Sequence, residues 1–146
     1  MGKAKGTARI ARGLTDMSPP VVTRQDDPRW SPDPERPVDE YSIDFPIAGL
    51  GRLKGRQSLD AETGRIVEFA LSAQIERDGT WHSIARIDTR HEEVHLHILN
   101  RRGDTIVRRV IRIIRGPEDV DSGWDESVTV LTDDWEEHER RWTNGR

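Results

Sequence analysis

Residues 66–99 read IVEFALSAQIERDGTWHSIARIDTRHEEVHLHIL, and this stretch decides the fold. Apolar and polar residues alternate along it, which is typical of strands that bury one face. The first apolar face consists of Val67, Phe69, Leu71, Ala73 and Ile75. Asp78 and Gly79 form a hairpin signal, and residues 90–93 mark a second turn. The stretch therefore predicts three successive antiparallel strands.

The register of these strands follows from keeping apolar residues on one face. A two-residue hairpin loop would place Leu71 opposite Arg86, so we expect a bulged or longer connection that places it opposite Ile87. The turn at 90–93 then sets Asp88 opposite His95 and Arg86 opposite His97 on the other face, and pairs Ile87 with Leu96 and Ala85 with Ile98. This register puts Trp81 on the apolar side. It leaves Ile84 and Leu99 on the histidine face, which indicates that a partner or second chain partly covers that face.

The flanking sequence adds further elements. Residues 41–47 alternate as a strand with one buried face. The next stretch, interrupted by Gly49, Gly51 and Gly55, is a weaker candidate for a short strand, with residues 60–64 as the turn after it. Residues 106–114 form another strand, which stops at Gly116 and Pro117. A helical stripe follows, formed by Trp124, Val128, Leu131, Trp135, His138 and Trp142. Ser122 is a candidate cap, although Val128 and Val130 would suit a later start near Asp133. We expect an α+β fold in which an antiparallel β-meander of four to six strands packs against one C-terminal amphipathic helix.

Composition sets the domain organisation. The chain has 146 residues, of which 33% are hydrophobic and 34% charged, and six of its eight prolines lie between Pro19 and Pro37. Such a segment buries too little apolar surface to offset the entropy of ordering it. The sequence predicts a disordered, basic and proline-rich tail at 1–39 and a single α+β domain at 40–146. The basic run at 101–115 and the acidic run after it most often indicate charge pairing within the chain, and a nucleic-acid surface is the less common alternative.

Several functional classes are excluded or disfavoured. The chain has no cysteine, which excludes disulfides, thiolate metal sites and a cysteine nucleophile, and favours a cytoplasmic location. No apolar run approaches the roughly 18 residues that a membrane helix needs, and no apolar core of a secretory signal follows the basic start. Phosphate-loop, nucleophile-elbow and dinucleotide-binding motifs are absent from the sequence.

The chemistry concentrates on one strand face. Arg86, Asp88, His95 and His97, with His91 in the adjoining turn, are candidate catalytic residues, because opposite residues on one sheet face lie roughly 5 Å apart. Asp88 could orient His95, one histidine could accept a proton while the other donates one, and Arg86 could stabilise an anion. Such a set suits cleavage of RNA by its own 2′-hydroxyl without a metal.

Two other interpretations of this face stay open. Asp88, His95 and either His91 or His97 are suitable ligands for zinc or another divalent ion, so a metal is possible but not required. Cross-strand Asp–His and Arg–His pairs on a solvated sheet face also occur without any function.

The segment 86–97, RIDTRHEEVHLH, resembles an uncharacterised bacterial family, a domain of unknown function with the pattern R-Y-D-T-x-H-x-x-x-H-x-H. The resemblance covers residues 43–142. Ile87 replaces the tyrosine of the pattern, and Glu92 replaces the usual glycine after the first histidine. More loosely, the segment is similar to TumE-type toxins of bacterial toxin–antitoxin pairs, which are small proteins neutralised by a partner. That similarity implies an RNA-directed or translation-inhibiting activity.

Two functional hypotheses follow. The first is a small toxin-like enzyme that acts on RNA through Arg86, Asp88, His95 and His97, with His91 assisting. The second is a non-enzymatic module whose sheet face or edge strand binds a protein partner or forms a homo-oligomer. Neither hypothesis involves a membrane.

Overall fold

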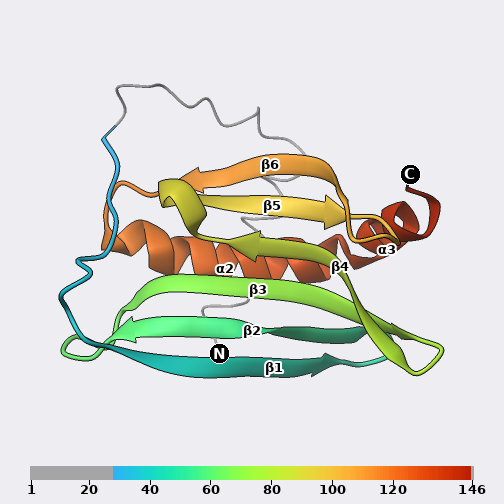
Figure 1. Cartoon of the computed structure of the whole chain (residues 1–146), viewed down its shortest axis with the longest axis horizontal. Coiled ribbons are helices and arrows are strands. Elements are labelled where there is room, and N and C mark those ends of the chain that lie inside the picture. Colours follow the sequence, from blue (N-terminus) through green and yellow to red (C-terminus); the bar gives the residue numbers. More distant parts are fainter. Residues whose placement is uncertain (1–27, 146) are drawn as a thin grey trace.

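Six antiparallel strands in chain order form one sheet, as the computed structural model shows in Figure 1. The structure describes residues 28–145. The strands are β1 (Val38–Ile47), β2 (Gly51–Asp60), β3 (Ile66–Arg77), β4 (Thr80–Asp88), β5 (Glu93–Leu99) and β6 (Thr105–Ile113), with a short 3₁₀ turn, η1 (Arg90–Glu92), before β5. The α+β class and the antiparallel meander are confirmed, and the six strands of the described residues are the upper limit of the predicted four to six.

The helical stripe forms two consecutive helices, α2 (Pro117–Asp133) and α3 (Trp135–Asn144), which lie across one face of the sheet (Figure 1). They separate at Asp134, whose backbone has φ −100° and ψ 22°. Helix α2 begins at Pro117, because proline has the φ that a first helical position needs and acidic residues follow it in the first turn. Ser122, the predicted cap, therefore lies inside α2.

The main core lies between the helices and strands β3 to β6. Trp135 and Leu131 are buried beneath the sheet, and Trp124 packs edge-on against Phe69 with ring centroids 5.2 Å apart. Gly123 lets α2 approach the sheet, since a Cβ there would lie 2.7 Å from Cγ2 of Val94. The three tryptophans of the stripe are core residues, as the periodicity predicts.

A β-bulge decides which residues of β4 face outward. The turn at Asp78 and Gly79 has only two residues, both with positive φ, so the extra residue of β4 is not in the turn. It lies within the strand, because Gln74 pairs with Ser83 whereas Ala73 pairs with Ala85. Ile84 is left over as the bulge and lies in the core. Leu71 lies opposite Ile87, which confirms the predicted register.

The bulge reverses two predicted orientations. Simple alternation predicts Trp81 on the apolar side and Ile84 on the histidine face, and both placements are wrong: Trp81 is 39% exposed, and Ile84 is fully buried. The alternation changes phase at the bulge, which a strict period of two cannot anticipate. Leu99 is also buried within this chain. No second chain is required to cover either residue.

The edge strand β1 is less covered than its pattern predicts. Tyr41 is 52% and Phe45 45% exposed, whereas Ile43 and Ile47 are partly buried. The helices pack mainly over β3 to β6, so the apolar face of β1 extends beyond them.

Part of the predicted tail contacts the sheet. Residues 1–27 lie outside the described residues. Within 28–37, the backbone N–H of Trp30 donates to Ile114, and Arg36 forms an ion pair with Asp60. Among the described residues, no helix is both long enough and apolar enough to cross a bilayer.

Candidate active site

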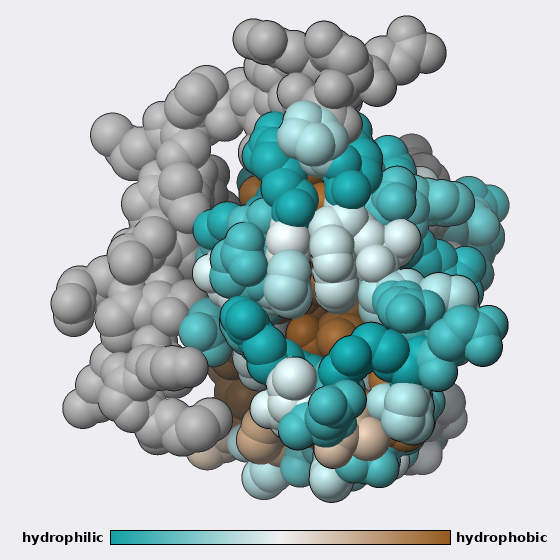
Figure 2. All heavy atoms as spheres, turned by 90° about the vertical axis from the view of Figure 1, so that its left-hand side faces the viewer, coloured by the Kyte–Doolittle hydropathy of each residue, from teal (hydrophilic) through white to brown (hydrophobic). Residues whose placement is uncertain are grey.

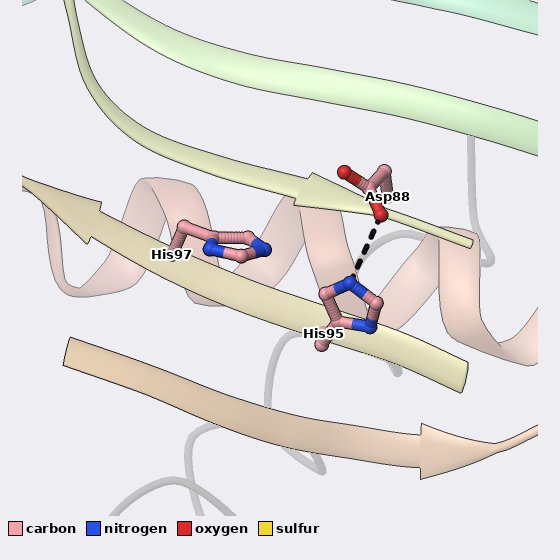
Figure 3. Close-up of side chains that lie close together, drawn as sticks. All are labelled: Asp88, His95 and His97. Carbon is pink, nitrogen blue, oxygen red and sulfur yellow. Dashed lines mark ion pairs between the residues drawn. The ribbon is translucent and has the colours of Figure 1, made fainter. Parts of the chain in front are cut away.

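The predicted cross-strand pairs of the histidine face are confirmed. In the ladder between β4 and β5, Asp88 lies opposite His95 and Arg86 opposite His97, while Ile87 and Ala85 pair with Leu96 and Ile98 toward the core. Figure 3 shows Asp88, His95 and His97 on the sheet face away from the helices, with their side chains directed toward one another.

Asp88 connects the η1 turn to His95. Its Oδ1 atom lies 3.2 Å from Nε2 of His95 and accepts a hydrogen bond of 3.2 Å from the backbone N–H of Arg90. His95 is only 3% exposed, and within residues 28–145 its Nδ1 atom has no hydrogen-bond partner, although Oε1 of Glu93 lies 3.8 Å away. Asp88 therefore holds the Nε2 side of the ring, and Glu93 lies near its Nδ1 side without a hydrogen bond.

His97 and His91 are more accessible than His95. His97 is half-buried, its ring centroid lies 5.1 Å from that of His95, and its Nδ1 atom lies 3.3 Å from the hydroxyl of Thr105. His91 is exposed in η1, with its ring stacked 6.4 Å from His95. Its backbone has φ 61°, in the left-handed region that side chains other than glycine rarely adopt. The structure therefore brings all five predicted site residues together, with one histidine deep and two near solvent.

These side chains line an open pocket of about 700 Å³. Its wall carries four arginines, namely Arg56, Arg86, Arg90 and Arg108, together with Asp88 and Glu68 as acidic residues. The small side chain of Ala70, between Arg56 and Asp88 in the ladders, leaves room at its centre. Figure 2 views the end of the molecule where β4 ends and β5 begins, and hydrophilic residues cover most of it. The pocket suits an anionic ligand.

Burial and neighbouring charge set the protonation of the histidines. Desolvation lowers the pKa of His95 below its usual 6.5, and Arg108 lowers it further against the opposing effect of Asp88. Desolvation likewise lowers the pKa of His97, with the positive charge of Arg86 as the next cause. Both imidazoles are therefore mainly neutral near pH 7 and able to accept a proton.

The same atoms could hold a metal. A carboxylate oxygen of Asp88 and ring nitrogens of His95 and His97 all lie within 4.8 Å of one another among the described residues. Two imidazoles and a carboxylate suit zinc. Of the two predicted alternatives for the third ligand, His97 belongs to this cluster.

Sequence reasoning missed some residues of the site. Arg56 comes from β2, two strands away from Asp88, and Glu93 belongs to the site rather than only to the predicted turn. The alternation of Arg52, Lys54 and Arg56 along β2 is the signal that places a basic row on the same outer face. A strand interrupted by glycines gives too weak a pattern for its register to be inferred.

Comparison with known proteins gives a family but no activity. No curated protein and no solved structure matches the chain. One family profile, described as a domain of unknown function (DUF7718), matches residues 39–146, which confirms the resemblance to an uncharacterised family. The chain therefore belongs to this family of domains of unknown function, DUF7718.

Proposed function

We propose that this protein is a small toxin-like enzyme that cleaves RNA in the bacterial cytoplasm. The observation that carries the proposal is the juxtaposition of imidazoles and an oriented carboxylate inside a pocket lined by four arginines. General acid–base catalysis needs positioned groups of suitable pKa, and an RNA phosphodiester brings both an anion and its own 2′-hydroxyl nucleophile. The looser similarity to TumE-type toxins supports the choice of substrate.

The reaction assigns a role to each side chain. The 2′-hydroxyl oxygen attacks phosphorus and the bond to the 5′-oxygen breaks, giving a 2′,3′-cyclic phosphate and a free 5′-hydroxyl. His97, neutral near pH 7, accepts the proton of the 2′-hydroxyl, and the exposed His91, when protonated, donates one to the 5′-oxygen. Arg86 stabilises the negative charge that develops on the phosphoryl oxygens.

His95 is too deeply buried to exchange a proton with the substrate directly. At 3% exposure, with Nε2 facing Asp88, its ring does not reach substrate without a rearrangement. We assign Asp88 and His95 as positioning residues that hold the η1 turn, and therefore His91, in the same pocket as His97. In contrast to the sequence-based hypothesis, the proton transfers are proposed for His97 and His91.

The test is cleavage of a single-stranded RNA by purified protein in the presence of EDTA. Wild type should give products with 2′,3′-cyclic phosphate ends, and His97→Ala should reduce the rate by at least about 100-fold, the usual contribution of an acid or base. Arg140→Ala, which removes an exposed cation on the helical side, serves as the control and should cleave at the wild-type rate.

Three outcomes would contradict the proposal. A rate that survives His97→Ala would indicate a contaminating nuclease, and cleavage abolished by EDTA would favour the metal centre. Absence of product from folded wild type would exclude this chemistry for the RNA used. Expression in bacteria connects the result to toxicity, since growth arrest should require His97.

A second candidate function is binding of a protein partner through β1. It is favoured by the exposed Tyr41 and Phe45 on β1, which is an edge strand of the sheet formed by residues 28–145. A partner there could neutralise the enzyme or be the whole function. The two functions separate in the cleavage assay, because Tyr41→Ser combined with Phe45→Ser should leave RNA cleavage unchanged while weakening any self-association or partner binding.

A further inference from the structure

Basic residues recur across the outer face of the sheet, beyond the catalytic pocket. The registers place Lys54 of β2 opposite Ser72, Ser72 opposite Arg86, Arg86 opposite His97 and His97 opposite Arg108 of β6. Cations therefore stand on every second strand from β2 to β6. At about 4.8 Å per strand, the row spans about 19 Å.

Among residues 28–145, three of the four cations of this face lack a carboxylate partner, namely Lys54, Arg56 and Arg86. None of these three has a carboxylate oxygen of the described residues within 4.0 Å, whereas Arg108 has Glu93 at 3.8 Å. Elsewhere the arginines are paired more closely, as Arg112 is with Glu126 at 2.6 Å. An outer face with unpaired cations in a row attracts a polyanion.

An aromatic side chain lies on the same face at the far end of β4. The bulge at Ile84 turns Trp81 outward, where it is 39% exposed, and the Arg52 guanidinium lies 4.0 Å from the centroid of its ring. Arg52 is in turn held by a 2.8 Å hydrogen bond to Gln74. A ring fixed in this way loses little freedom when a base stacks on it. Trp81 lies opposite Glu76 and Arg86 opposite Ser72, four residues apart on β3, so about 13 Å of strand separates the two side chains.

We propose that this outer face binds a single-stranded RNA segment of several nucleotides, with its phosphates along Lys54, Arg56, Arg86 and Arg108 and one base stacked at Trp81. The inference rests on the proposed function, whose substrate class it specifies. A single strand is favoured over a duplex because stacking on a side chain requires an unpaired base. On β1, the exposed Asp44 lies opposite Lys54 and Glu40 lies opposite Ser58, so acidic residues limit the basic row at its β2 end.

Binding is measured with a fluorescein-labelled 2′-O-methyl uridine 12-mer, which lacks the nucleophile and stays intact. Fluorescence anisotropy should show binding that weakens with salt, and Lys54→Ala should reduce the slope of log affinity against log salt by about 0.7, as for one phosphate contact on a single strand. Trp81→Ala should weaken binding at least about fivefold. Trp81→Phe should bind within about threefold of wild type, since a smaller ring still stacks, and Arg140→Ala should be unchanged.

A dinucleotide substrate separates this inference from the proposed function. If the dinucleotide and a cleavable 12-mer are cut with equal kcat/KM, and Lys54→Ala and Trp81→Ala bind like wild type, the extended surface is wrong while the catalytic proposal stands. If the 12-mer binds as expected but neither RNA is cleaved, the surface stands and the proposed reaction is wrong. If polyglutamate binds and the 12-mer does not, the face recognises an acidic protein and the inference is overturned.

Discussion

Two consecutive residues at the mouth of the pocket adopt a left-handed backbone. His91 and Glu92 both have φ 61°, a conformation that costs an L-residue roughly 1–2 kcal/mol. Glu92 occupies the position at which the family pattern carries a glycine. The positive φ found here explains why glycine would be favoured at that position. Strain of this kind persists where the surrounding structure holds it in place, and it is common at active sites.

Replacing Glu92 by glycine should therefore stabilise the protein. Glycine adopts this φ without a steric penalty, and after its greater entropy in the unfolded chain is subtracted we expect a gain of about 0.5–1 kcal/mol. The backbone carbonyl of residue 92, which accepts from the N–H of Ile114, is retained. Urea denaturation measures the change.

The neighbouring substitution Arg90→Gly is the matched control, because Arg90 does not have positive φ. It should lower stability, since glycine there gains no relief and only increases the entropy of the unfolded chain. A loss of stability in Glu92→Gly as well would show that contacts of the Glu92 side chain outweigh the backbone strain.

For single residues, the sequence predicts which side chains lie opposite one another better than it predicts how deeply each one is buried. Asp88 opposite His95 follows from the register, because any one-residue slip would expose the apolar face. The burial of His95 does not follow, since alternation assigns it to the polar face in the same way as His97. Its surroundings come from separate segments, since Asp88 of β4 lies 3.2 Å from its Nε2 atom and the ring of His91 in η1 stacks 6.4 Å away.

For whole elements, the sequence predicts which segments form strands but does not predict where a strand carries a bulge. Turn residues and alternation indicate the strands β3, β4 and β5, whereas the position of the bulge at Ile84 depends on how β4 packs and not on a local signal. The helix start is missed because Pro117 reads as a stop for β6, although proline also suits the first turn of the next helix.

The close approach of α2 to the sheet at Gly123 predicts the effect of a small substitution. Alanine favours helix over glycine by up to about 1 kcal/mol, yet a Cβ at Gly123 would lie 2.7 Å from Cγ2 of Val94. Valine is rigid at χ1 and cannot move aside within a packed core. We therefore expect Gly123→Ala to destabilise the protein by about 1–3 kcal/mol in urea denaturation.

A double-mutant cycle with Val94→Ala tests this cause. Val94→Ala alone leaves a cavity and is destabilising, but it also removes the atom that the new methyl group of Gly123→Ala would meet. The double variant should be more stable than the sum of the two changes by at least about 0.5 kcal/mol. Additive effects would show that Gly123→Ala acts through something other than this contact.

Across the whole molecule, the charges divide into paired and unpaired sets. Arg112 of β6 forms ion pairs with Asp119 at 2.8 Å and Glu126 at 2.6 Å on α2, so part of the basic run pairs with the acidic run as the composition suggests. Arg108 of the same run faces the pocket instead. Composition alone could not separate these roles, because they depend on which face of β6 each side chain occupies.

Buried histidines make the stability of the whole fold sensitive to mild acid. His138 joins the two helices: its Nε2 lies 3.1 Å from the carbonyl oxygen of Val130, and the ring is 3% exposed. Burial lowers its pKa below 6.5 despite this hydrogen bond, with Arg109 of β6 and Arg141 of α3 lowering it further and Glu137 opposing them. The unfolded chain then binds more protons than the folded one below about pH 6.5, so stability is lost as the pH falls through that value.

The variant His138→Gln keeps a donor for the Val130 carbonyl and removes this titration. Between pH 7.5 and 5.5, wild type should lose up to about 1.4 kcal/mol more free energy of unfolding than the variant, the limit for one proton over one pH unit. His95 and His97 contribute equally to both proteins, and Glu137, whose pKa its neighbours Arg140 and Arg141 lower to about 2, acts only in stronger acid. Urea denaturation at the two pH values measures the difference. Equal losses in the two proteins would mean that His138 is protonated in the folded state and that its burial is relieved by local opening between α2 and α3.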